Sequence, residues 1–556
     1  MKKLALILSA LALLLPAGYR EVEACTNVIV TKGASADGSV MVSYAVDSHQ
    51  LYGELYFHPA ADYAQGAMLD VYNWDSGKFS GTIPQVPHTY QTVGNMNERQ
   101  LIICETTFGG REELANPLAV VGYGSLIYVT LQRAGTAREA IRVIDAMLQE
   151  FGYIDEGETF SIADKDECWI MELIGKGPGR KGGVWVARRV PDGMICAHAN
   201  QSRITTFPLN DPENCLYSPD VISFAREMGY FSGKDEDFSF REAYCPLNWD
   251  GLRGCESRTW AAFRLLGGRN FDADKYFDFA SGHNPSNNMP LFVKPDHKLT
   301  LKEVADVMRD HYEGTPLDTR NDLGAGDYGL PNRWRPISFT LDGTDYEFER
   351  PIATQQTGFW YVCQARPQLP DEFGGICWFG VDDAATSALT PIYTTVSHAP
   401  ACFAQGNGNM TTYSETSAFW LFTRVAHFAY LFYDRTEPFI RGFADRYELE
   451  NLDLIKEVDA LARDMIASGN ANQVREMLTR WCDERSQYLF DSWKTMERFL
   501  LVKFMDGNVK KQNEDGSFMD NGAGVGIPEM PEWPKHKESW LRAIVAQRGD
   551  SMKSGN

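Results

Sequence analysis

The sequence predicts an α+β protein with a helical C-terminal region. Short β-rich segments and helical segments are mixed along the chain without a regular βαβ repeat, and the pattern becomes helical from about residue 415. The 556 residues are 44% hydrophobic and 12% aromatic, enough to bury a large core. We therefore expect a globular, layered protein with a domain at 25–435 and a helical region with an extended tail at 436–556.

The first 24 residues are predicted to be a signal peptide or propeptide. Lys2 and Lys3 precede an apolar run from Leu4 to Leu15 that is too short to span a bilayer comfortably. Val22-Glu23-Ala24 then places small or moderately small residues where a signal peptidase cuts. We expect export to the periplasm or the extracellular space, with a mature chain that begins at Cys25. A lipid-anchored surface protein acylated at Cys25 is the lesser alternative, because Glu23 stands where lipoprotein signals usually carry a small uncharged residue.

Charge and hydropathy exclude two other classes. The formal net charge is -22, which repels nucleic acid and anionic lipid surfaces. The most apolar later segment, Phe419 to Tyr433, is interrupted by Arg424 and His427 and is shorter than the roughly 20 residues of a membrane-spanning helix. We predict a buried helix there and no stable membrane span.

The segment after Cys25 predicts a β-hairpin. Two β-rich stretches, Thr26 to Lys32 and Ser39 to Tyr44, flank an Asp-Gly turn at Asp37. Because the two strands have similar lengths, the second should return to the start of the first. The hairpin therefore predicts that Asp47 lies near Cys25.

Further elements follow from spacing. Strands are expected at Leu101 to Glu105, Cys168 to Ile174 and Gly183 to Arg188, and a helix at Ala137 to Phe151. The glycine-rich run 175–183 lacks the Gly-Lys-Ser/Thr ending of a phosphate loop, so we interpret it as a loop between two strands.

The C-terminal region has helical periodicity. Apolar residues fall on one helix face between Leu452 and Met465, and further helices are expected at 472–484 and 487–506. The Gly- and Pro-rich stretch from Asp506 to Pro534 predicts an extended surface segment.

An N-terminal cysteine can supply both a nucleophile and its base. The α-amino group of Cys25 would have an ordinary pKa of about 8, which suits proton transfer near neutrality, and Asp47 is placed to orient it. The eleven cysteines are too sparse for a disulfide scaffold, and no C-x-x-C or H-E-x-x-H motif signals a zinc site. From the residues alone, Cys25 as a lipid anchor or buried thiol and Asp47 as a strand cap stay open.

A series of short motifs runs in order along residues 25 to 395. They are Cys25-Thr26-Asn27, Lys32–Ser39, Asp47-Ser48, Met96–Glu98, Glu105–Gly110, Ala197–Gln201, Ser257-Arg258, Glu313–Thr315, and the block from Gln364 and Arg366 through Trp378 to Pro391 and Tyr393. This series resembles the dipeptidase A family of cysteine peptidases, within the penicillin V acylase-like N-terminal-nucleophile hydrolases. Each motif is modest, but their joint order is specific.

The resemblance implies a four-layer αββα sandwich with Cys25 at the end of a central strand. It also implies hydrolysis of dipeptides or short peptides through a thioester, with no metal or organic cofactor. Asp47 matches the acid that holds the α-amine. Asn200 matches an oxyanion-hole amide, and Arg258 matches an arginine near the nucleophile that would favour the thiolate. Thr107 aligns with a second oxyanion contact in related amidases, although the residue type differs.

One position departs from the family pattern. Many relatives carry arginine three residues before the aspartate, whereas this chain has Tyr44, which brings no positive charge. Tyr44 either shapes the substrate pocket or is a plain strand tyrosine. Glu105 is a candidate partner for the free amine of a substrate or an ordinary strand-end carboxylate, and His198 is expected to be structural.

Two alternative functions stay open at this point. One keeps the mechanism but acts on non-peptide N-acyl amides, and the other is a non-catalytic surface lipoprotein acylated at Cys25. The sequence leaves open the oligomeric state, with a homo-oligomer as one option. It also leaves open whether a signal peptidase or self-processing exposes Cys25.

Overall fold

Two antiparallel sheets form the centre of the molecule. The computed structural model describes residues 25–332 and 338–554. In spatial order, the seven-stranded sheet contains β16 (Phe292–Val293), β14 (Ile195–His198), β1 (Thr26–Val30), β2 (Val40–Asp47), β19 (Thr357–Ala365), β20 (Gly375–Val381) and β21 (Thr390–Tyr393). The eight-stranded sheet contains β15 (Cys215–Tyr217), β13 (Gly183–Arg189), β12 (Cys168–Gly175), β11 (Gly157–Ala163), β10 (Ile102–Phe108), β9 (Met96–Asn97), β8 (Thr92–Val93) and β3 (Phe57–His58). Short hairpins pair β4 (Ala61–Asp62) with β7 (His88–Thr89), β5 (Met68–Tyr72) with β6 (Phe79–Pro84), and β17 (Ser338–Leu341) with β18 (Thr344–Glu347).

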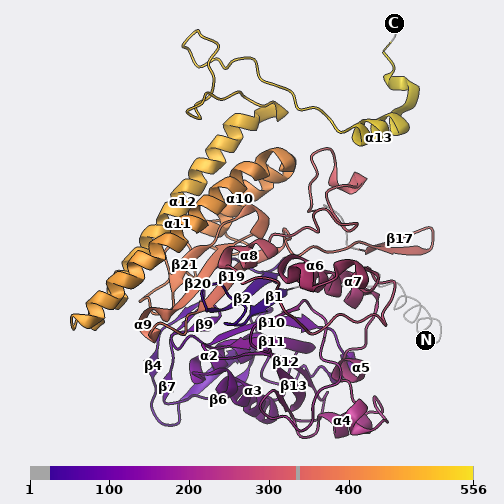
Figure 1. Cartoon of the computed structure of the whole chain (residues 1–556), viewed down its shortest axis with the longest axis vertical. Coiled ribbons are helices and arrows are strands. Elements are labelled where there is room, and N and C mark those ends of the chain that lie inside the picture. The colour runs from indigo at the N-terminus through magenta and orange to yellow at the C-terminus, as the bar shows by residue number, and fades with distance from the viewer. Residues whose placement is uncertain (1–24, 333–337, 555–556) are drawn as a thin grey trace, which may run out of the picture.

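Both faces of each central sheet are covered. Strand β10 lies against β1 and β2, so the two sheets face each other. Helices α2 (Tyr123–Arg133) and α3 (Ala137–Phe151) pack on the eight-stranded sheet, while α6 (Ser257–Gly267) and α8 (Leu301–Val307) pack on the seven-stranded one (Figure 1). Successive side chains along a strand point to opposite faces of the sheet. In β10, Ile102 therefore packs in the core between the sheets, and Ile103 packs under α2 and α3. The α+β prediction is confirmed.

The hairpin and loop predictions agree with the structure. Strands β1 and β2 pair so that Asn27 lies opposite Tyr44, and Gly38 in the turn adopts a φ of 76° that favours glycine. Helix α3 has the predicted limits, and the run 175–183 joins β12 to β13 as expected. Asp47 is the last residue of β2 and therefore returns to the start of β1.

A helical region covers the far end of the seven-stranded sheet. It contains α10 (Ala418–Leu431), α11 (Tyr433–Ala467) and α12 (Ala471–Phe504), and α12 packs on β21 (Figure 1). The prediction of two helices at 472–484 and 487–506 was wrong: α12 is continuous, because residues 485–487 contain no glycine or proline to end it. Residues 508–534 then run as an extended segment to α13 (Glu538–Arg548), as predicted.

The remaining helices are short. They are α4 (Val221–Glu227), α5 (Phe240–Tyr244), α7 (Ala273–Ala280) and α9 (Asp371–Gly374), and a π-helical turn, Gly251–Glu256, leads directly into α6. Within residues 25–332 and 338–554, none of the helices combines the length and apolar character needed to cross a membrane.

Candidate active site

Cys25 lies immediately before β1, between the two sheets and the start of α6. Its side chain is buried, and its Sγ lies 3.5 Å from Oε1 of Glu105 and 3.9 Å from the hydroxyl of Tyr44. The Tyr44 hydroxyl also donates to Glu105. The structure therefore brings three of the predicted site residues together around one sulfur atom.

Arg258 binds the main chain of Cys25 and the side chain of Asn200. The π-helical turn before α6 places its guanidinium in the core, where Nη1 donates to the Cys25 carbonyl at 2.7 Å and Nη2 donates to Oδ1 of Asn200 at 3.0 Å. The arginine is fully buried. Its hydrogen bonds to Cys25 and Asn200 reach the Cys25 carbonyl and the Asn200 side chain, so Arg258 holds these two residues in one geometry.

Asn200 presents its amide in a fixed orientation. Its backbone has a φ of 58°, in the left-handed region, directly after β14. Because Arg258 occupies Oδ1, the Nδ2 group faces the other way and donates one hydrogen to the carbonyl of Thr107 at 2.7 Å. An amide nitrogen carries two hydrogens, so a second N–H remains for a developing oxyanion. The oxyanion role of Asn200 stays a prediction.

Asp47 is buried next to a second arginine. Its Oδ2 accepts from Nη2 of Arg350 at 3.0 Å, and its Oδ1 accepts from the hydroxyl of Thr357 at 2.6 Å. Burial raises the pKa of Asp47, while Arg350, Thr357 and Arg258 act in the opposite direction. The carboxylate is thus held by fixed donors on the side of β2 that faces Arg258.

Glu105 and Glu158 form a buried acidic pair beside the thiol. Burial raises the pKa of both carboxyl groups, and each influences the other's titration. Glu158 accepts a hydrogen bond from the hydroxyl of Thr107 at 3.0 Å. The hydroxyl of Thr107 is therefore engaged away from the thiol, and its role as an oxyanion donor stays a prediction.

The thiol of Cys25 is disfavoured as an anion in the full-length chain. Burial raises its pKa well above the usual value, and the charges of Glu105 and Asp47 raise it further, against the backbone N–H of Asp47 and the hydroxyl of Tyr44. In this chain Cys25 follows Ala24, so its nitrogen belongs to a peptide bond and carries no ammonium charge. Activation of the thiol consequently requires an additional positive charge.

His198 bridges the two sheets. Its Nδ1 lies 2.7 Å from the Thr106 hydroxyl and its Nε2 lies 2.7 Å from the Ser161 hydroxyl. Burial lowers its pKa to about 3, so the ring is neutral near pH 7. Both ring nitrogens are occupied, as expected for a structural histidine.

Comparison with known proteins identifies the family. The sequence model of Peptidase family C69 matches residues 24–446. The chain belongs to peptidase family C69. It is similar to a probable dipeptidase of Salmonella dublin, with 25% identity over 68% of this chain and 83% of the relative, and to a probable dipeptidase A of Streptococcus pyogenes serotype M3 (strain SSI-1), with 25% identity over 81% and 93%. A dipeptidase of Bifidobacterium longum (strain NCC 2705) is 26% identical over 68% of this chain and 72% of its own. The resemblance inferred from the motifs is thereby confirmed, and the protein is a peptidase.

Two residues of this C69 peptidase site were not found from the sequence. Arg350 supplies a positive charge beside Asp47, yet it lies 303 residues further along the chain. Glu172 accepts hydrogen bonds from the backbone N–H groups of Arg203 and Ile204, at 2.5 Å and 3.1 Å, and so anchors the chain just after Asn200. Neither residue has a local motif, and only a covarying partner in related sequences would have indicated them.

If Asn200 has the predicted oxyanion role, its replacement by alanine is expected to lower kcat of the peptidase about 10²- to 10³-fold. Arg258 and Thr107, the hydrogen-bond partners of Asn200, lie in α6 and β10. These elements should keep their positions in the variant, so KM should change little. Steady-state kinetics on a hydrolysed dipeptide measures both constants. A matched control is Asn214→Ala on the exposed turn before β15, which should leave kcat unchanged.

Proposed function

We propose that this peptidase is an exported dipeptidase whose nucleophile is the thiol of Cys25, freed as the N-terminal residue by cleavage after Ala24. The observation that carries the proposal is the position of Cys25, with its carbonyl bound by Arg258 and its thiol 3.5 Å from Glu105. The names of the relatives supply the reaction class. The helix–sheet–sheet–helix packing described above supports assignment to the αββα sandwich of N-terminal-nucleophile hydrolases.

Cleavage would supply the missing positive charge. Once the peptide bond to Ala24 is cut, the neutral α-amino group of Cys25 can accept the proton of its own thiol, and the ammonium that results stabilises the thiolate. Asp47, held by Arg350 and Thr357, lies at the end of the neighbouring strand, where it can accept a hydrogen bond from this amine. The amine thereby serves as the proton acceptor for the thiol.

The reaction then follows acyl transfer. The Cys25 thiolate attacks the peptide carbonyl, and the oxyanion that forms accepts a hydrogen bond from the second N–H of Asn200. The α-ammonium of Cys25 passes its proton to the leaving amine as the C–N bond breaks, which leaves a thioester on Cys25. Water then attacks the thioester, gives up a proton to the same amine and releases the second product.

Glu105 explains a preference for substrates with a free amino terminus. In a dipeptide the α-amine is two bonds from the carbonyl carbon that Cys25 attacks, so an ammonium in a reactive complex lies close to the sulfur. The Glu105 carboxylate, 3.5 Å from the same sulfur, is at a suitable position to bind it. The bound ammonium would also offset the effect of Glu105 on the thiol pKa. N-acyl amides lack this charge, which favours peptides over the alternative substrate class.

Glu105→Gln is expected to raise KM for dipeptides about tenfold, which corresponds to about 1.4 kcal/mol, while N-acetylated dipeptides remain equally poor substrates. Ionised Glu105 is required for ammonium binding, and burial raises its pKa above the usual value. In the wild type, kcat/KM should therefore fall as the pH drops through this raised pKa, and the variant should lose that limb. The pH dependence of kcat/KM, measured for both proteins, tests this role of Glu105. If kcat/KM of the variant falls at low pH as it does in the wild type, the role of Glu105 is contradicted.

A further inference from the structure

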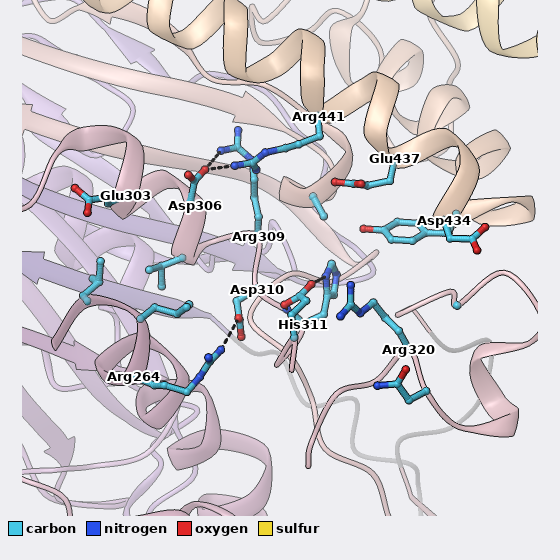
Figure 2. Close-up of a pocket in the computed structure, with 18 of the residues that line it drawn as sticks. Arg264, Glu303, Asp306, Arg309, Asp310, His311, Arg320, Asp434, Glu437 and Arg441 are labelled. Carbon is cyan, nitrogen blue, oxygen red and sulfur yellow. Dashed lines mark hydrogen bonds and ion pairs between the residues drawn. The ribbon is translucent and has the colours of Figure 1, made fainter. Parts of the chain in front are cut away.

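A large charged cavity lies outside the candidate active site. Its volume is about 820 Å³, within the range of about 300 to 1,000 Å³ typical of small-molecule sites. It opens between α6, α8, the segment 309–320 and α11, at the junction of the sheets with the helical region (Figure 2). Neither Cys25 nor Glu105 lines it.

On two walls of the cavity, the arginine side chains form ion pairs with carboxylates of the protein itself. Arg309 and Arg441 both bind Asp306, and Arg264 binds Asp310 at 3.3 Å (Figure 2). These pairs leave little net charge to attract a ligand, since each cation is satisfied by a neighbouring carboxylate. Recognition must therefore come from the remaining lining groups.

Two of the remaining residues that line the cavity, His311 and Glu437, have side chains that can carry opposite charges. His311 is buried, its Nδ1 lies 3.2 Å from Glu313, and its Nε2 has no hydrogen-bond partner within the described residues. Burial lowers the pKa of His311, but Glu313 raises it to a net increase above the usual value; when the ring is protonated, Nε2 is a donor. Across the cavity, Glu437 on α11 accepts no hydrogen bond from any described residue. A buried donor without a partner is costly, and a ligand carboxylate would satisfy it.

We propose that this cavity is a second binding site for a free amino acid, with its carboxylate on His311 and its ammonium on Glu437. Glu313 offsets the charge of a protonated His311, so His311 offers a directed N–H at Nε2, whereas Glu437 offers a carboxylate. A ligand with both a carboxylate and an ammonium satisfies both groups. Lys537, which also lines the cavity, adds a cation at the rim. Free amino acids are the products that the proposed function would release, but the site itself rests on the cavity and not on that reaction.

The cavity is connected to the catalytic centre by one segment. The backbone N–H of Tyr312 donates to Asp310 at 2.9 Å, and its hydroxyl donates to the carbonyl of Arg350 at 2.6 Å. Tyr312 has a φ of 63°, which is strained for a bulky residue. Arg350 in turn holds Asp47. A ligand beside His311 therefore contacts the segment that positions the catalytic carboxylate.

Calorimetric titration of the mature Cys25→Ala protein with each of the twenty free amino acids tests the proposal, since this variant separates binding from turnover. At least one amino acid should bind, and its N-acetyl and amide derivatives should bind at least tenfold more weakly. Glu437→Gln and His311→Gln should each weaken binding about tenfold, whereas Glu457→Gln, on an exposed part of the same helix, should have no effect.

Three results would overturn the proposal. They are a failure of all twenty amino acids to bind, equal binding of the N-acetyl derivative, and binding that falls in Glu105→Gln but not in the cavity variants. The last result would place the amino acid at the catalytic site. The titration measures binding and not activity. A failure of the proposed dipeptidase function would therefore be distinguished from a failure of the second binding site.

Discussion

Replacing Cys25 by alanine is expected to abolish dipeptide hydrolysis, with a loss in kcat of at least about 10⁴-fold. No other thiol is placed to substitute, because Cys25 is the cysteine that contacts Glu105 and Tyr44 and whose carbonyl Arg258 binds. The substitution removes one buried sulfur atom, so the free energy of unfolding should fall by only about 1 kcal/mol. Release of free amino acids from a dipeptide panel measures the loss in kcat. Thermal unfolding followed by circular dichroism measures the change in the free energy of unfolding.

Two further variants sharpen this test. Cys25→Ser should retain a little activity, because a hydroxyl is harder to ionise than a thiol but occupies the same position. Cys482→Ala removes a buried thiol from α12, far from the site along the chain, and should remain fully active. Intact mass must show that residues 1–24 are absent from each protein compared. Full activity in Cys25→Ala would exclude the proposed nucleophile.

Asp47→Asn is expected to reduce both stability and activity. The substitution leaves the guanidinium of Arg350 buried without its carboxylate, which typically costs about 3 to 5 kcal/mol. It also removes the acceptor that orients the α-amine of Cys25, so kcat should fall about 10²-fold or more. Chemical denaturation and steady-state kinetics measure the two effects separately.

The double variant Asp47→Asn/Arg350→Met separates the structural effect from the catalytic one. Removal of the guanidinium that has lost its Asp47 partner should recover much of the stability, since buried ion pairs are often replaceable by apolar groups. Activity should not recover, because the amine still lacks its acceptor. A double variant with full activity would show that Asp47 only stabilises the fold.

The parts of the site that could be predicted depend on local chain geometry or on motif order. The Asp37-Gly38 turn and the similar strand lengths place Asp47 beside Cys25 without any long-range information. Asn200 and Arg258 were found because their motifs resemble those of a family, and the structure brings them within one hydrogen bond of each other.

The parts that were missed depend on tertiary contacts. Arg350 reaches Asp47 from a segment 303 residues away, and nothing in its neighbours marks it as an ion-pair partner of β2. The continuity of helix α12 was also missed, although residues 485–487 contain no glycine or proline that would end a helix. The cavity beside His311 is assembled from segments that lie far apart between residues 264 and 537, so no single pattern could indicate it.

Mass spectrometry of the active enzyme, with and without brief exposure to a dipeptide, tests whether Cys25 is an N-terminal nucleophile. We expect a chain that begins at Cys25 with a free α-amine, and a transient species heavier by one aminoacyl group attached at Cys25 as a thioester. Full activity in a protein that retains Ala24, or an active protein whose Cys25 carries a diacylglyceryl group, would contradict it.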